Sequence, residues 1–106
     1  MWTLLDIKNI DSIKMYSKKD NLTKKLNETQ TRKIVIDWND SEIFDYRDKP
    51  FDSIYYPDYS YKLFVYHNGI SSEFITSNYL MADKNKWTYI MSEKRDVEYF
   101  NKMWHE

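Results

Sequence analysis

The sequence predicts an α+β domain in which an antiparallel sheet of about four or five strands carries a C-terminal helix on one face. Two observations support this: a hairpin signal at residues 61–77 and a helical spacing of apolar residues at 93–105. A third is that the connections between the predicted strands are too short for parallel crossovers. At 106 residues the chain has room for a single hydrophobic core, so residues 1–106 are expected to form one globular domain.

The first third of the chain leaves its structure open. Apolar residues recur at helical spacing between residues 4 and 13, but Asn9 to Asp11 would equally suit the bend between two short strands. A short helix is predicted over residues 22–30, with Asn21 as its N-terminal cap.

A strand is predicted next, over residues 32–38, where Ile34, Ile36 and Trp38 alternate with their neighbours and would share one buried face. Residues 39 and 40 then favour a turn, and residues 42–46 are expected to return as a partner strand. Residues 47–60 hold both prolines and several aspartates and serines, a composition typical of an ordered surface loop.

The clearest element is the β-hairpin. Asn68 and Gly69 separate two strand-like runs and suit the positive φ angles of a type I′ turn. A two-residue turn fixes the register. The expected pairs are Leu63 with Phe74, Val65 with Ser72 and His67 with Ile70 on the core face, and Lys62 with Ile75, Phe64 with Glu73 and Tyr66 with Ser71 on the outer face. The outer rings, Phe64 and Tyr66, are either surface rings or half of a homodimer contact.

The chain is predicted to end with a strand and a helix. Residues 86–91 form the strand, after a turn at 83–85. Ser92 would cap a helix over residues 93–105, in which Glu98 and Lys102 make a favourable i, i+4 pair on the outer side. The apolar face of this helix would consist of Val97, Phe100, Met103 and Trp104.

Composition excludes several function classes. The chain has no cysteine, which removes disulfides, thiol nucleophiles and the common zinc sites, and it has one glycine, which removes Gly-rich phosphate loops.

The first residues lack a basic leader and a cleavage site, and no apolar run approaches the roughly 20 residues that span a bilayer, so a cytoplasmic location without membrane contact is expected. Residues with AT-rich codons predominate, which indicates an AT-rich bacterium, its phages or its plasmids.

No catalytic or metal-binding constellation is recognisable. His67 flanks the hairpin turn and His105 is the penultimate residue, without the neighbours of a nucleophilic site. Residues 37–48 loosely follow a calcium-loop spacing, but Glu42 stands where that loop needs glycine. Asp58 follows proline as in some metal-dependent nucleases, but the acid-x-Lys that this motif requires does not follow it in the sequence. Neither a cofactor nor a metal is therefore expected.

Charge is distributed unevenly along the chain, although the net charge is −1. Residues 1–33 carry 8 basic and 4 acidic groups, whereas residues 34–60 carry 2 basic and 7 acidic groups among many aromatic rings. This acidic aromatic segment is either a docking surface for a basic partner or a loop that packs over the sheet with its acids in water. The candidate partner-binding residues are Trp38, Asp40, Asp45, Tyr46, Asp48, Asp52, Tyr55, Tyr56, Asp58 and Tyr59.

These observations favour a small non-enzymatic protein-binding module, a stoichiometric inhibitor of the counter-defence, immunity or host-modulating type, encoded by a phage or mobile element. Its partner would be a protein with a basic surface, such as a nucleic-acid-handling or defence enzyme. The alternative is a nucleic-acid or nucleotide binder that uses the basic N-terminal third. A small enzyme that relies on carboxylates alone is the third hypothesis.

Overall fold

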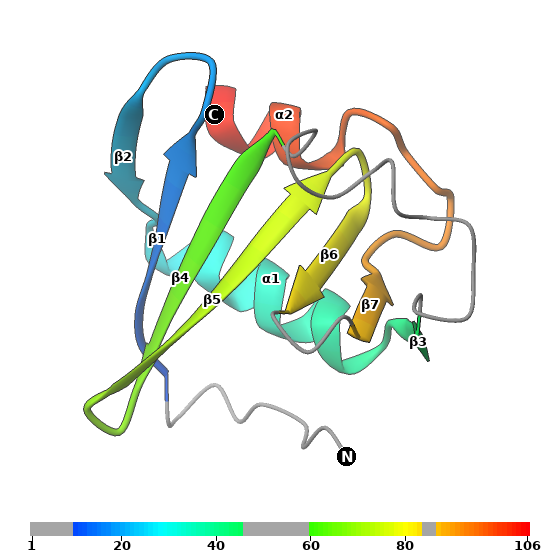
Figure 1. Cartoon of the computed structure of the whole chain (residues 1–106), viewed down its shortest axis with the longest axis horizontal. Coiled ribbons are helices and arrows are strands. Elements are labelled where there is room, and N and C mark those ends of the chain that lie inside the picture. Colours follow the sequence, from blue (N-terminus) through cyan, green and yellow to red (C-terminus); the bar gives the residue numbers. More distant parts are fainter. Residues whose placement is uncertain (1–9, 46–59, 84–86) are drawn as a thin grey trace.

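The computed structural model describes residues 10–45, 60–83 and 87–106, and these residues form the predicted α+β architecture (Figure 1). They contain a seven-stranded sheet, rather than one of four or five strands, in the order β2-β1-β4-β5-β6-β7-β3 with every neighbouring pair antiparallel. The elements are β1 (Ile10–Ser17), β2 (Leu22–Lys25), α1 (Glu28–Asn39), β3 (Glu42–Asp45), β4 (Tyr61–His67), β5 (Ile70–Ser77), β6 (Leu80–Asp83), β7 (Trp87–Ile90) and α2 (Tyr99–His105).

Both helices lie against the same face of the sheet (Figure 1). On this face the strands contribute buried residues at every second position, as a sheet with one covered side requires. Ile13 and Met15 of β1, together with Leu63 and Val65 of β4, are completely buried there. From the helices, the core receives Ile34, Trp38, Tyr99, Phe100, Met103 and Trp104.

The central hairpin has the predicted register. All six predicted pairs between residues 62 and 75 are present, and an additional pair joins Tyr61 to Thr76. Asn68 and Gly69 have φ angles of 50° and 76°, which is the sign that a type I′ turn requires at both positions. Asn21 and Asn78, which follow β1 and β5, also have positive φ angles, so asparagine supports three of the strand connections.

The strand predicted over residues 32–38 is wrong, because these residues belong to α1. The helix begins with a capping box: the Asn27 side chain accepts a hydrogen bond from the Gln30 backbone N–H, and the Gln30 side chain accepts one from the Asn27 N–H. Its buried residues are Gln30, Ile34, Val35 and Trp38, which follow the helical period. Ile36, which alternation would bury, is 57% exposed.

Other predicted elements also differ from the structure. Residues 22–25 form strand β2, so the predicted helix over residues 22–30 is wrong, and Asn21 occupies the turn before β2. The early residues could have formed a helix or two short strands that meet at residues 9–11. Residues 10–17 form one strand, β1, with an irregularity near Asp11. Strand β3 lies at the sheet edge and pairs with β7, not with residues 32–38. β6 was not predicted, whereas β7 matches the predicted strand.

The C-terminal helix is present but shorter than predicted. It begins at Tyr99, and Ser92 does not cap it. Val97 precedes the helix and is 58% exposed, whereas Phe100, Met103 and Trp104 are buried as predicted. Lys102 pairs with Asp96 and not with Glu98. Neither helix in the described part of the chain is long and apolar enough to cross a bilayer.

Candidate functional site: an acidic cleft between the two helices

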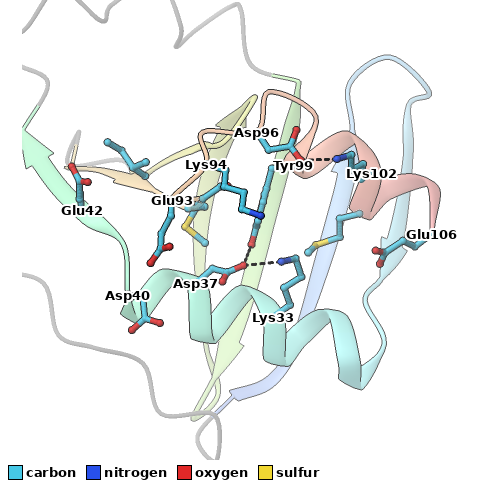
Figure 2. Close-up of a pocket in the computed structure, with 14 residues that line it drawn as sticks. Lys33, Asp37, Asp40, Glu42, Glu93, Lys94, Asp96, Tyr99, Lys102 and Glu106 are labelled. Carbon is cyan, nitrogen blue, oxygen red and sulfur yellow. Dashed lines mark hydrogen bonds and ion pairs between the residues drawn. The ribbon is translucent and has the colours of Figure 1, made fainter.

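A cleft of about 420 Å³ opens between α1, α2 and the segment that joins β7 to α2 (Figure 2). It collects acids from four parts of the chain: α1 and its C-terminal cap, β3, the segment before α2, and the chain end. Six carboxylates and three lysines line it: Asp37, Asp40, Glu42, Glu93, Asp96 and Glu106, with Lys33, Lys94 and Lys102.

Apolar side chains form part of the cleft wall. Ile90, Met91 and Met103 line it and are at most 8% exposed. An acidic rim above an apolar wall matches the amphipathic side chains of lysine and arginine, which bear a cation at the end of an aliphatic stem.

The centre of the cleft is organised by Asp37. Its Oδ2 atom accepts hydrogen bonds from the Tyr99 hydroxyl and, at 3.1 Å, from the Lys33 ammonium (Figure 2). Lys33 also lies 4.9 Å from the centroid of the Tyr99 ring. Burial of the phenol, together with the hydrogen bond to Asp37 and its charge, raises the pKa of Tyr99 well above its usual value. This network ties α2 to α1 and holds the cleft walls together.

Two further ion pairs shape the segment before α2. Lys102 donates to Asp96 at 2.6 Å, which lowers the pKa of Asp96 and raises that of Lys102. Arg95, whose φ angle is 51°, lies 3.8 Å from Glu42 of β3. Both pairs involve exposed side chains, so they orient the segment more than they stabilise the fold.

The remaining acids are available to a partner to different degrees. Glu106 accepts a hydrogen bond of 3.2 Å from the Gln30 amide, which also donates to the Met103 carbonyl. Asp40 and Glu93 are exposed and form no ion pair with any residue in the described part of the chain. These two carboxylates therefore give up no ion pair with the described residues when a cation binds.

The acids of the cleft are spread apart. Among residues 10–45, 60–83 and 87–106, no three acidic or histidine side chains converge closely enough to hold a metal ion. Together, the carboxylates create a negative potential across the whole cleft, beside its apolar wall. Such a surface suits the recognition of an extended basic surface.

The structure places only part of the predicted docking surface. Asp40, an exposed residue at the end of α1, lies on the cleft. Trp38 does not belong to an exposed surface, because it is 2% exposed and packs edge-on against Phe74 at 4.7 Å. Asp45 ends β3, and the other predicted residues lie outside the described part of the chain: Tyr46, Asp48, Asp52, Tyr55, Tyr56, Asp58 and Tyr59.

Of the six cleft acids, the predicted docking residues include Asp40 alone; Asp37 and Glu42 lie within the acidic segment 34–60 but were not among the candidates. Glu93, Asp96 and Glu106 come from the C-terminal segment, where acidic and basic groups are balanced and no local signal marks a site. They join Asp37 and Asp40 because α2 lies beside α1 in the folded chain. A helix over residues 30–38 puts Asp37 at the edge of its buried face. The sequence of this helix does not reveal that Tyr99, 62 residues away, donates a hydrogen bond to Asp37.

The other candidates have structural partners. His67 lies 3.2 Å from the Ser72 hydroxyl across the hairpin. From the basic N-terminal third, Lys24 donates to the Trp104 carbonyl and lies over the Trp104 ring at 4.2 Å, which connects β2 to α2. The chain matches no model of a protein family, no curated protein and no solved structure.

Proposed function

We propose that this chain is a non-enzymatic protein-binding module that inhibits its partner stoichiometrically by placing the acidic cleft over a basic surface. The observation that supports this most directly is the cleft lining, in which six carboxylates outnumber three lysines beside the buried Met91 and Met103. The cleft contains Asp40 and two further acids, Asp37 and Glu42, of the acidic segment identified in the sequence.

The physical basis is the combination of steering and anchoring. The negative potential of the cleft accelerates encounter with a cationic surface, and the apolar wall takes up the aliphatic stem of an inserted lysine or arginine. Asp40 and Glu93 make no ion pair within the described residues. A cation of the partner can therefore pair with them without displacing a cation of the described residues.

The predominance of residues with AT-rich codons supports a phage or mobile element of an AT-rich bacterium as the source. In this proposal the protein is of counter-defence, immunity or host-modulating type and acts in the cytoplasm on a host or rival protein. Nucleic-acid-handling and defence enzymes are the partner class that fits best, because their phosphate-binding surfaces are basic. A protein that covers such a surface with carboxylates competes directly with the nucleic acid.

The test is affinity capture from the lysate of a low-GC bacterium, followed by mass spectrometry. The double variant Asp40→Lys/Glu93→Lys reverses the charge of the two cleft acids that make no ion pair among the described residues. We expect it to lose a partner that the wild-type chain captures, because the same surface then repels a basic protein. We also expect added salt to weaken wild-type capture, since exposed charges are screened.

A matched control changes the net charge by the same amount elsewhere. Asp11→Lys/Glu73→Lys reverses two exposed acids on β1 and β5, neither of which lines the cleft. This variant should capture the partner as well as the wild type does. Capture that survives the cleft reversal, or that both double variants lose equally, would reject the cleft as the docking surface.

A further inference from the structure

A second surface lies on the face of the sheet opposite both helices. Tyr16 of β1, together with Phe64 and Tyr66 of β4, point to this outer face because their neighbours in sequence are the buried core positions, and each ring is partly exposed. The pairing between β1 and β4 sets Tyr16 opposite Lys62 and Lys14 opposite Phe64. Rings and lysines therefore alternate across this part of the sheet.

The charge of this surface is positive. Lys14 and Lys25 are exposed and directly opposite each other on β1 and β2, an arrangement of like charges that is unfavourable by itself. Among the residues in register on the outer side of β2, β1, β4 and β5, Glu73 is the single acid, and it lies 4.0 Å from Lys62. An anion bound between Lys14 and Lys25 would relieve their repulsion.

The rings stand on strand positions that suit successive bases. Phe64 and Tyr66 are two residues apart on one strand, and Tyr16 is the diagonal neighbour of Phe64, so the backbone positions that carry adjacent rings are about 7–8 Å apart. The ammonium of Lys14 lies 5.5 Å from the centroid of the Tyr66 ring, which places a cation beside a stacking surface. Proteins that bind single strands combine these two elements, aromatic stacking and a basic track for phosphates.

We propose that the outer face of β2, β1 and β4 binds single-stranded nucleic acid, with Tyr66, Phe64 and Tyr16 stacking on bases and with Lys14 and Lys25 contacting phosphates. A duplex does not fit this surface in the same way, because its bases are stacked on each other and not free to meet the rings. The surface lies on the opposite side of the sheet from the acidic cleft, so each proposal can fail independently of the other.

The test is fluorescence anisotropy with a labelled oligothymidylate of about 12 nucleotides at about 50 mM salt. We expect Tyr66→Leu to weaken binding about tenfold, because leucine offers no aromatic ring on which a base can stack. Tyr66→Phe keeps the ring and should retain affinity. Lys14→Glu should weaken binding and reduce its salt dependence, and a duplex of the same length should bind more weakly.

Lys94→Glu is the matched control, because it makes the same charge change on an exposed residue of the cleft side. It should leave oligonucleotide binding unchanged. The proposal is overturned if the wild type does not bind the oligonucleotide, if Tyr66→Leu binds as well as Tyr66→Phe, or if Lys14→Glu and Lys94→Glu behave alike. It is also overturned if light scattering shows a dimer that Tyr66→Leu converts to a monomer, since the rings then form a homodimer contact.

Discussion

Replacing Trp38 with alanine is expected to lower the free energy of unfolding by about 3–5 kcal/mol, the usual cost of removing a large aromatic side chain from a core. Trp38 is 2% exposed, and its ring meets Phe74 at 4.7 Å and Tyr89 at 5.7 Å, both edge-on. Its loss would leave a cavity between α1 and the sheet. Urea denaturation followed by circular dichroism measures the change.

Ile36→Ala is the control for this prediction. Ile36 lies two residues from Trp38 on the same helix but is 57% exposed, so its truncation should change stability by no more than about 0.5 kcal/mol. If residues 32–38 formed a strand with Ile36 and Trp38 on one buried face, the two variants would be destabilised together. A Trp38→Ala variant that keeps its stability but loses its partner would instead return Trp38 to the docking surface.

Stability is expected to fall steeply above about pH 10 because two core tyrosines resist ionisation. Tyr89 is completely buried and donates to Asp83 at 3.1 Å, and Tyr99 is 6% exposed and donates to Asp37. Burial and then the nearby carboxylates raise the pKa of both phenols. In the unfolded chain both phenols ionise near pH 10. The contribution of the two protonated phenols to the free energy of unfolding is therefore fully present below that pH, and it is lost as the pH rises toward their folded-state pKa values.

The magnitude follows from proton linkage. While a tyrosine is protonated in the folded chain and ionised in the unfolded chain, the free energy of unfolding falls by about 1.4 kcal/mol per pH unit, or about 3 kcal/mol per pH unit for two. Urea midpoints measured across this range give the slope. Tyr99→Phe should reduce the slope by about 1.4 kcal/mol per pH unit. An equal slope in this variant would show that Tyr99 ionises in the folded chain.

The sequence was sufficient where local geometry alone decides the structure. The hairpin was predicted residue by residue, because a two-residue turn at Asn68 and Gly69 allows one register and the alternation of Leu63 and Val65 selects the core face. The existence of a C-terminal helix was also predictable. Its start was not, because Arg95 takes a positive φ angle and Asp96 binds Lys102 in the turn before the helix.

Helix α1 shows why the alternation of apolar residues does not predict every element. Over seven residues, Ile34 and Trp38 fit both a period of two and a helical period, so alternation could not separate the two structures. The deciding signal lay upstream, in the capping box of Asn27 and Gln30. Gln30 is polar but buried, because its amide donates to the carbonyl of Met103, a partner 73 residues away that no local pattern reveals.

The candidate site was predictable only in its acidic character. Asp40 and Glu42 belong to a segment whose charge imbalance is visible in the sequence, and both line the cleft. Glu93 and Asp96 reach the cleft through the packing of α2 beside α1, a contact that depends on the whole fold. Strand β3 likewise joins the far edge of the sheet through its pairing with β7.

Site-specific photo-crosslinking can show whether a basic protein docks on the acidic cleft or elsewhere on the molecule. A benzophenone amino acid would replace Glu93, which lines the cleft, and in a second variant Glu73, which is exposed on the outer face of the sheet. We expect a crosslink to a protein partner from position 93 and none from position 73. A crosslink from position 73 alone would show that the partner docks on the sheet and not on the cleft.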